Sequence, residues 1–178
     1  MKTTQILIAG FGGQGVLFAG KFLAYKGLVQ DKNVSWLPSY GPEMRGGTAN
    51  CSIILSDMPV GSPIITNPDV LVAMNLPSLQ KFVNDVVPGG QIFIDSTLID
   101  AKVERDDVQV FYIPATQIAK DAGFSTLANM VLMGKVMKES GAVDFAGNKE
   151  TLEKFIPAKK ANLIDINCQA LQTGYDFA

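Results

Sequence analysis

Near its amino end the chain contains the stretch Gln5-Ile-Leu-Ile-Ala9, followed at once by Gly10-Phe-Gly12-Gly13-Gln14-Gly15. A short, uninterrupted apolar run that ends in glycines is typical of a strand buried on both faces of a parallel sheet. Apolar residues then recur with helical spacing from Gln14 to about Val29. The sequence therefore predicts a strand, a glycine turn and a helix in direct succession.

The rest of the chain continues this alternation of strands and helices. Further strands are predicted at residues 33–37, 48–55, 70–74, 91–95 and 108–113, and further helices at 77–86, 115–122, 125–140, 149–155 and 158–173. Residues 39–47 are expected to be irregular, and a connector rich in Pro and Gly covers residues 59–68. This order predicts one α/β domain over residues 1–178, with an open, mainly parallel, Rossmann-like sheet and helices on both faces.

The composition excludes several classes of function. The 178 residues include 15 Lys and Arg, 17 Asp and Glu, and no His. Because the net charge is −2 and no basic block occurs, nucleic acid is not expected as a partner. Without histidine the chain lacks the commonest general base and cannot form a Ser-His-Asp triad, a Cys-His pair or a His-containing metal site. We therefore expect no catalytic residue and no metal in this chain.

Cysteine usage and the amino-terminal residues indicate the compartment. Cys51 and Cys168 lie far apart and form no CxxC motif, so the chain cannot build a four-Cys iron-sulfur cluster or a zinc ribbon. Both thiols are expected to be reduced, buried and inert, as in a cytoplasm. Residues 3–20 carry no charge, but five glycines interrupt them, which argues against a signal peptide or a membrane span. A soluble, cytoplasmic protein with no membrane partner is expected.

The balance of polar and apolar residues predicts a large contact. Charged residues make up 18% of the chain, below the average of about 25%. Hydrophobic residues make up 47%, and the mean hydropathy is +0.20. A chain with so few surface charges is expected to bury part of its surface against another subunit or a second copy of itself.

The GxGxxG motif contains Gly12, Gly13, Gln14 and Gly15 and lies between a predicted strand and a predicted helix. Glycines there allow a tight turn, and the start of a helix presents free N–H groups to a phosphate. NAD-binding units place Asp or Glu at the end of the second strand, but residues 34–38 contain no carboxylate. A diphosphate or another anion is therefore the expected ligand. The alternative is that the glycines serve turning and packing alone.

A second motif, Ser39-Tyr-Gly-Pro-Glu-Met-Arg-Gly-Gly-Thr-Ala-Asn-Cys51, follows the second predicted strand. Its glycines, including Gly46 and Gly47, and the opposite charges of Glu43 and Arg45 predict a fixed loop that holds the guanidinium in place. Ligands of open α/β sheets bind at the carboxyl ends of the strands, so this loop and the glycine turn should converge. The alternative is that Glu43 and Arg45 form a salt bridge at a subunit interface.

Asn129 lies in an apolar helix together with Met130, Met133 and Met137. The methionines are expected to pack in the core or in an interface. The amide of Asn129 needs hydrogen-bond partners, either in the backbone of a loop or in a ligand. The candidate ligand-binding residues are therefore those of the glycine turn, the Arg45 segment and Asn129.

Three segments resemble signature segments of the gamma subunit of 2-oxoacid:ferredoxin oxidoreductases: residues 8–16, 40–48 and 129–134. The resemblance continues to residues 167–175, and Gly15 and Arg45 matter most to it. It implies that the chain belongs to a complex that converts a 2-oxoacid, coenzyme A (CoA) and oxidised ferredoxin into acyl-CoA, carbon dioxide and reduced ferredoxin. Ferredoxin would then be a partner of the whole complex.

The resemblance also implies a division of labour among subunits. Thiamine diphosphate and the [4Fe-4S] clusters would lie on alpha and beta subunits, with a delta subunit left open, and this chain would bind no cofactor tightly by itself. Its own role would be to dock CoA through the diphosphate. Two alternatives are a purely structural interface subunit and a free-standing nucleotide-binding protein, and the isolated chain could form a homodimer. Pyruvate, 2-oxoglutarate, indolepyruvate and branched-chain acids all stay open as the 2-oxoacid.

Overall fold

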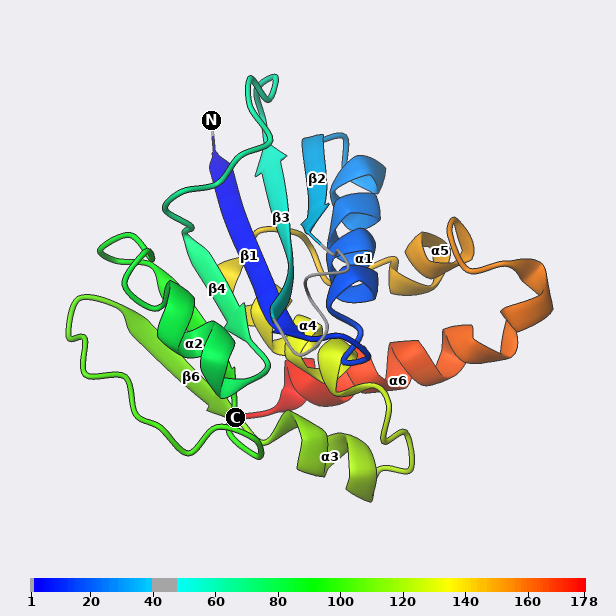
Figure 1. The fold of residues 1–178 in the computed structure, drawn as a ribbon. Coiled ribbons are helices and arrows are strands. Elements are labelled where there is room, and N and C mark those ends of the chain that lie inside the picture. Colours follow the sequence, from blue (N-terminus) through cyan, green and yellow to red (C-terminus); the bar gives the residue numbers. More distant parts are fainter. Residues whose placement is uncertain (1, 40–47) are drawn as a thin grey trace.

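The computed structural model describes residues 2–39 and 48–178 and contains one six-stranded sheet (Figure 1). The strands are β1 (Thr3–Phe11), β2 (Asn33–Ser39), β3 (Thr48–Ser56), β4 (Val70–Ala73), β5 (Gln91–Asp95) and β6 (Gln109–Ile113). Their order across the sheet is β2-β3-β1-β4-β5-β6. Each of these strands coincides with a predicted one to within a few residues at its ends.

The helices are α1 (Val16–Val29), α2 (Leu76–Phe82), α3 (Ala115–Asp121), α4 (Ala128–Ser140), α5 (Asn148–Glu153) and α6 (Asn162–Asp176). The prediction placed the start of α4 at residue 125, which is wrong by three residues. Residues 124–127 form a separate turn, in which the Leu127 N–H donates to the Phe124 carbonyl at 2.9 Å. The predicted helix 158–173 is likewise divided, because the 3-10 turn Ala158–Lys160 precedes α6.

The sheet is mainly parallel, as predicted, with β3 as the strand that runs in the opposite direction. β3 pairs antiparallel with both β1 and β2, whereas β1, β4, β5 and β6 pair in parallel. The register places Thr48 opposite Phe11 and Asn50 opposite Ser39. The two described residues that flank segment 40–47, Ser39 and Thr48, therefore lie at the same edge of the sheet as the end of β1.

Helices cover the two faces of the sheet unequally. On one face α1, α3 and α4 contribute to a large apolar core, and α6 packs against the outer side of α4. Residues 129–137 of α4 are consequently buried on every side, as expected for a helix that is enclosed between two layers. On the other face α2 packs on β1 and β4 (Figure 1). Among the described residues, no helix covers β2 and β3 on that face.

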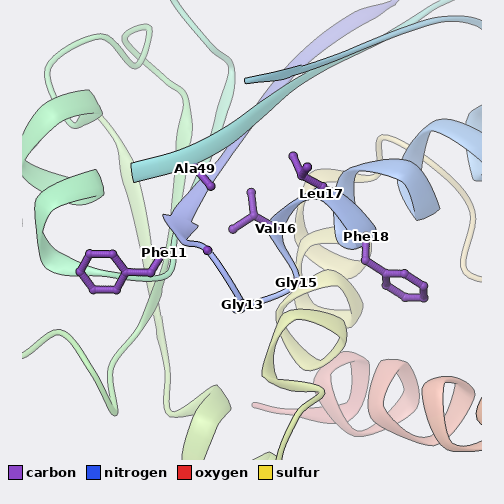
Figure 2. Close-up of a pocket in the computed structure, with 8 residues that line it drawn as sticks. Phe11, Gly13, Gly15, Val16, Leu17, Phe18 and Ala49 are labelled. Atoms are coloured by element: carbon purple, nitrogen blue, oxygen red, sulfur yellow. The ribbon is translucent and has the colours of Figure 1, made fainter. Parts of the chain in front are cut away.

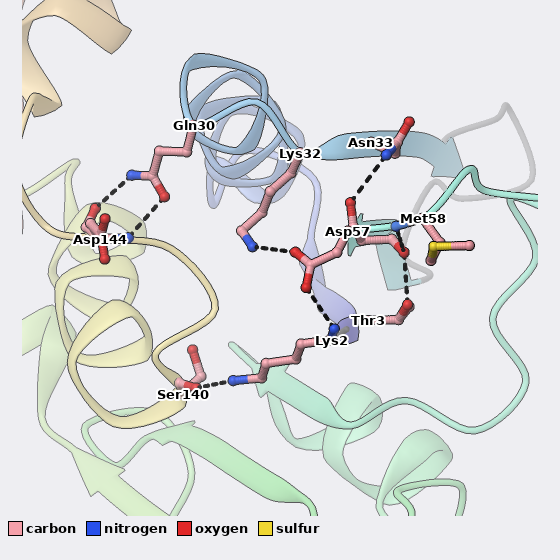
Figure 3. A network of polar contacts seen from close by, with 10 residues as sticks. Lys2, Thr3, Gln30, Lys32, Asn33, Asp57, Met58, Ser140 and Asp144 are labelled. Carbon is pink, nitrogen blue, oxygen red and sulfur yellow. Dashed lines mark hydrogen bonds and ion pairs between the residues drawn. The ribbon is translucent and has the colours of Figure 1, made fainter.

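Charged side chains tie the chain together at the amino end of β1. Asp57 accepts hydrogen bonds from the Lys2 backbone N–H at 2.7 Å and from Lys32 Nζ at 3.2 Å (Figure 3). Both contacts lower the pKa of the Asp57 carboxyl, and the hydrogen bond from the Lys2 backbone has the larger effect. Lys2 Nζ also donates to the Ser140 carbonyl at 3.3 Å. This network lies at the edge of the sheet opposite the glycine turn.

Several large apolar side chains of the described residues are exposed. These exposed side chains belong to Phe11, Leu28, Val29, Trp36, Leu37, Met58, Ile64, Leu98 and Leu163. They agree with the predicted large contact, which stays a prediction. None of the helices in residues 2–39 and 48–178 is both long and apolar enough to cross a membrane.

The two cysteines differ in their surroundings. Cys51 is buried on β3, and burial raises the pKa of its thiol to about 12. Cys168 is only partly buried, so the expectation that both thiols are buried is wrong for Cys168. The reason is that α6 forms the outer layer of the helical face. The pKa of the Cys168 thiol is raised, and partial burial is the main cause.

We expect a thiol reagent at pH 8 to leave Cys51 unmodified in the native protein, because the reactive thiolate is scarce and inaccessible there. Cys168 should react slowly, and both residues should react at once in denaturant. Mass spectrometry of peptides after timed labelling measures the two rates separately. Rapid native labelling of Cys51 would contradict the burial described for β3.

Candidate functional site

The glycine turn between β1 and α1 adopts a backbone conformation that favours glycine. Gly13 has φ +92° and Gly15 has φ +74°, both in the left-handed region. A Cβ atom at Gly13 would meet no atom within 4 Å, so conformation alone requires that glycine. A Cβ atom at Gly15 would collide with the Asn129 amide. Turning and packing, the alternative reading of this motif, therefore account for the glycines at these two positions.

Gln14 closes the turn with its side chain. Its Oε1 accepts a hydrogen bond from the Phe11 N–H at 2.6 Å, and its Nε2 donates to the Met74 carbonyl at 2.9 Å. The side chain therefore connects the end of β1 to the end of β4. Gln14 thus shapes the turn. The oxygen and the nitrogen of its side-chain amide, which could otherwise contact a ligand, are both hydrogen-bonded to the backbone.

A pocket of about 310 Å³ lies beside the turn (Figure 2). Its lining residues are Phe11, Gly12, Gly13, Gly15, Val16, Leu17, Phe18 and Ala49. The first hydrogen bond of α1 runs from the Ala19 N–H to the Gly15 carbonyl, so the N–H groups of residues 16–18 have no acceptor inside the helix. No charged side chain is among these lining residues. Free N–H groups and the positive end of the helix dipole make the pocket suitable for an anion.

Asn129 joins the start of α4 to this turn. Its side chain is 2% exposed, and its Nδ2 donates to the Gly15 carbonyl at 3.1 Å. One of the two predicted kinds of partner, the backbone of a loop, is therefore present. Its Oδ1 has no hydrogen-bond partner among the described residues. Buried polar atoms are almost always paired, so this oxygen is an exception among the described residues.

The Arg45 segment cannot be placed at the site directly. Arg45, Gly46 and Gly47 lie outside the described residues, as does Glu43. The flanking residues Ser39 and Thr48 do lie at the edge of the sheet that carries the glycine turn. The convergence of the two loops stays a prediction that the positions of these flanking residues support.

Sequence reasoning did not include Asn167 of α6 among the candidates. Its side chain is 3% exposed, and its Nδ2 donates to the Leu163 carbonyl at 2.7 Å. Its Oδ1, like that of Asn129, has no partner among the described residues. The available signal was an amide on the apolar side of α6, next to buried Ile164 and Leu171. The methionines of α4 are buried as predicted: Met130, Met133 and Met137.

Comparison with known families assigns the chain to one of them. Residues 5–177 match the family described as pyruvate ferredoxin/flavodoxin oxidoreductase. The chain belongs to this family. The resemblance inferred from the signature segments is thereby confirmed over nearly the whole sequence.

Curated relatives in the family include two kinds of subunit. The ketoisovalerate oxidoreductase subunit VorA of Methanothermobacter thermautotrophicus is 43% identical over 176 residues, which are 98% of this chain and 36% of that protein. The 2-oxoglutarate synthase subunit KorC of Methanothermobacter marburgensis is 34% identical and is matched over 97% of this chain and 95% of its own length. The chain thus spans about a third of the VorA subunit and nearly all of KorC.

Solved structures of the family share the fold. The gamma subunit of the keto/oxoacid ferredoxin oxidoreductase from Geobacter sulfurreducens superposes with a TM-score of 0.80 at 28% identity, covering 97% of this chain and 96% of that one. A chain of 2-oxoglutarate:ferredoxin oxidoreductase from Magnetococcus marinus, solved with 2-oxoglutarate, coenzyme A and succinyl-CoA bound, gives 0.82 at 23% identity. This match covers 98% of the present chain and 31% of the Magnetococcus chain, and it establishes the fold alone.

Proposed function

We propose that the chain is the gamma subunit of a 2-oxoacid:ferredoxin oxidoreductase and that its glycine turn docks coenzyme A. Family membership and the full-length likeness to KorC support the subunit role. The observation that carries the docking role is the pocket at the start of α1: residues 16–18, whose N–H groups have no acceptor inside the helix, line it, and none of the described lining residues is charged. An anion such as the CoA diphosphate fits these donors.

The chemistry is divided between this chain and its partner subunits. In the complex a 2-oxoacid loses carbon dioxide, its acyl group passes to the CoA thiol, and the released electron pair reduces ferredoxin. Alpha and beta subunits carry thiamine diphosphate and the iron-sulfur clusters, and the complex works in the cytoplasm. The higher identity to VorA than to KorC favours a branched-chain 2-oxoacid such as ketoisovalerate.

The described residues of the site suit binding and positioning. The backbone N–H groups of α1 hold the diphosphate by hydrogen bonds and by the helix dipole, without a proton transfer. The Gln14 side chain fixes the turn against β4, so the donors are already in place before CoA arrives. Holding the diphosphate in this way leaves the thiol end of CoA free to reach the partner subunit that carries the acyl group.

Two substitutions of Leu17 that introduce opposite charges test this role. Leu17 lines the pocket at the second position of α1 and is only partly buried. In the assembled complex we expect Leu17→Glu to raise the KM for CoA about tenfold, because a carboxylate placed there repels the diphosphate. Leu17→Lys is the matched control of similar size, and its KM should be unchanged or lower. Steady-state rates at varied CoA concentration measure both.

The design separates repulsion from damage to the fold. A glutamate in the first turn of a helix interacts favourably with the helix dipole, so Leu17→Glu should not lower the free energy of unfolding. A purely structural subunit would give the same KM in both variants. An equal KM for CoA in the Glu and Lys variants, in complexes of normal mass, would contradict docking at this turn.

A further inference from the structure

The outer edge of β2 faces no other strand among residues 2–39 and 48–178, because β2 is the last strand in the order of the sheet (Figure 1). The strand includes no charged side chain. Trp36 and Leu37 are 36% and 42% exposed, although both are large and apolar. Edge strands are usually short, charged or interrupted by proline, since a free edge pairs readily with a further strand. Of these sequence features β2 has a single one, Pro38.

The ladder between β1 and β3 shows how the backbone groups of β3 are directed. The Asp57 N–H donates to the Lys2 carbonyl at 3.0 Å. This bond continues the register in which Thr3 lies opposite Ser56. Backbone groups of successive residues in an antiparallel ladder point to opposite sides. The odd-numbered residues of β3 therefore point to β1, and the even-numbered ones point to β2.

The same alternation identifies the backbone groups on the outer edge of β2. Asn33 lies opposite Ser56, an even-numbered residue of β3, so the odd-numbered residues of β2 point to β3. The N–H and C=O groups of Val34 and Trp36 consequently point outward, together with the carbonyl of Pro38. The proline ring replaces an N–H on this outer side and costs no bond to β3.

We propose that β2 pairs antiparallel with β2 of a second copy of this chain, about a twofold axis at Ser35. A twofold axis requires that one surface contacts itself, and two identical strands meet this condition when they run antiparallel. With the axis at Ser35, Val34 lies opposite Trp36 of the second copy, and Trp36 lies opposite Val34 of the second copy. The residues of each pair exchange both N–H···O bonds, so every outward group of Val34 and Trp36 has a partner.

The two neighbouring twofold registers leave backbone groups unpaired. With the axis at Trp36, Val34 would lie opposite Pro38, which has no N–H for the Val34 carbonyl. With the axis at Val34, Trp36 would lie opposite Lys32. The Lys32 N–H already donates to the Gly27 carbonyl at 3.0 Å, so it is not available to a second copy. The proline and the turn after α1 therefore select the axis proposed above.

The side chains agree with this register. A Cβ atom at Gly27 would lie 2.9 Å from Val34 Cγ2. One at Gly20 would lie 3.1 Å from Trp36 Nε1, so Val34 and Trp36 both lie on the face that α1 covers. The pairing sets each tryptophan beside a valine of the second copy, and pairs of an aromatic and a β-branched residue stabilise antiparallel sheets.

The charges next to β2 do not oppose the pairing. Asp31 and Lys32 directly precede the strand. They would lie opposite Ser39 and Pro38 of the second copy, so neither meets a like charge.

The pairing leaves the glycine turns accessible. β1 and β2 both run antiparallel to β3, so they are parallel to each other, whereas the second copy runs in the opposite direction. The two glycine turns therefore lie at opposite edges of the joined sheet, and neither is covered by the other copy's β2.

Cysteine cross-linking of the full chain tests the position of the axis. Ser35 faces its own counterpart in a pair whose Cα atoms are about 4.5 Å apart, a separation that a disulfide can span. All variants also carry Cys168→Ser, which removes the partly exposed native thiol. On mild oxidation at micromolar concentration we expect Ser35→Cys to form a covalent dimer, which non-reducing electrophoresis detects.

Leu37→Cys is the matched control on the same strand. Leu37 is more exposed than Trp36, but in this register it lies opposite Asn33 of the second copy. Its own two copies are then separated by four residues along the strand, more than about 13 Å. Leu37→Cys should therefore stay monomeric in the same electrophoresis, and a mixture of Leu37→Cys and Asn33→Cys should cross-link.

Opposite charges at Ser35 give a second readout. Ser35→Lys and Ser35→Glu each place two like charges opposite one another at the axis, so each should raise the dissociation constant of the dimer about tenfold. An equimolar mixture places lysine opposite glutamate and should restore association. Sedimentation at micromolar concentration measures the three samples. Recovery on mixing requires that both variants are folded, so it separates repulsion from damage to the fold.

Three outcomes would overturn this pairing. Ser35→Cys could cross-link no faster than Leu37→Cys. The chain could stay dimeric with Ser35→Lys and Ser35→Glu alike, which would place its interface elsewhere. The wild-type chain could be monomeric at micromolar concentration, which would leave the edge of β2 to a different protein.

Discussion

Gly174→Ala is expected to lower the free energy of unfolding by about 3 kcal/mol or more. Helices α4 and α6 cross at two glycines, and neither has room for a side chain. A Cβ atom at Gly174 would lie 2.7 Å from the Val131 carbonyl carbon, and one at Gly134 would lie 2.8 Å from the Tyr175 nitrogen. These neighbours are backbone atoms that cannot rotate away, so the two helices must separate, and the core that encloses α4 must open.

Urea unfolding followed by circular dichroism measures this loss. Gly61→Ala is the matched control, because Gly61 has no neighbour within 4 Å of an added Cβ and no positive φ. The free energy of unfolding of this control should lie within about 0.5 kcal/mol of the wild-type value. A Gly174→Ala variant as stable as the Gly61→Ala variant would contradict the close crossing of α4 and α6.

The strand, glycine turn and helix at the start of the chain were predictable because their signals are local. An apolar run, a GxGxxG motif and a helical repeat follow one another without a gap. The direction of β3 was also within reach of a physical rule. The eight residues 40–47 are too few for the crossover that a parallel neighbour of β2 requires, so β3 must run antiparallel. The position of β3 between β1 and β2 has no such local signal.

The candidate site was predictable where polarity conflicts with its surroundings. Asn129 is conspicuous because the residues that follow it at the start of α4 are apolar, and the structure places it against Gly15. Asn167 has a similar environment, but α6 carries polar residues on its outer side, so one more amide does not stand out. It is buried because α6 approaches α4 closely at Gly134 and Gly174. The contact is between residues about forty positions apart in the sequence, so neither composition nor local spacing predicts it.

Arg45→Ala, in the assembled complex, is expected to raise the KM for CoA about ten- to hundredfold. This range corresponds to the loss of one charge-assisted contact of about 1.5 to 3 kcal/mol. The described residues that line the glycine-turn pocket supply backbone N–H groups but no positive charge. A guanidinium from the segment between Ser39 and Thr48 would add the charge that the phosphates require. Arg45→Lys keeps the charge but loses the paired hydrogen bonds, so its KM should lie between those of the wild type and Arg45→Ala.

A single-turnover assay without CoA distinguishes docking from assembly. In the proposed complex, decarboxylation of the 2-oxoacid would precede the CoA step, so its rate should be nearly unchanged in Arg45→Ala. If Arg45 instead forms a salt bridge at a subunit interface, the substitution weakens association, and every partial reaction falls together with the mass of the complex. Rates and complex mass measured on the same samples decide between these readings. Unchanged CoA kinetics in an intact Arg45→Ala complex would remove Arg45 from the binding site and leave the helix start to hold the phosphates alone.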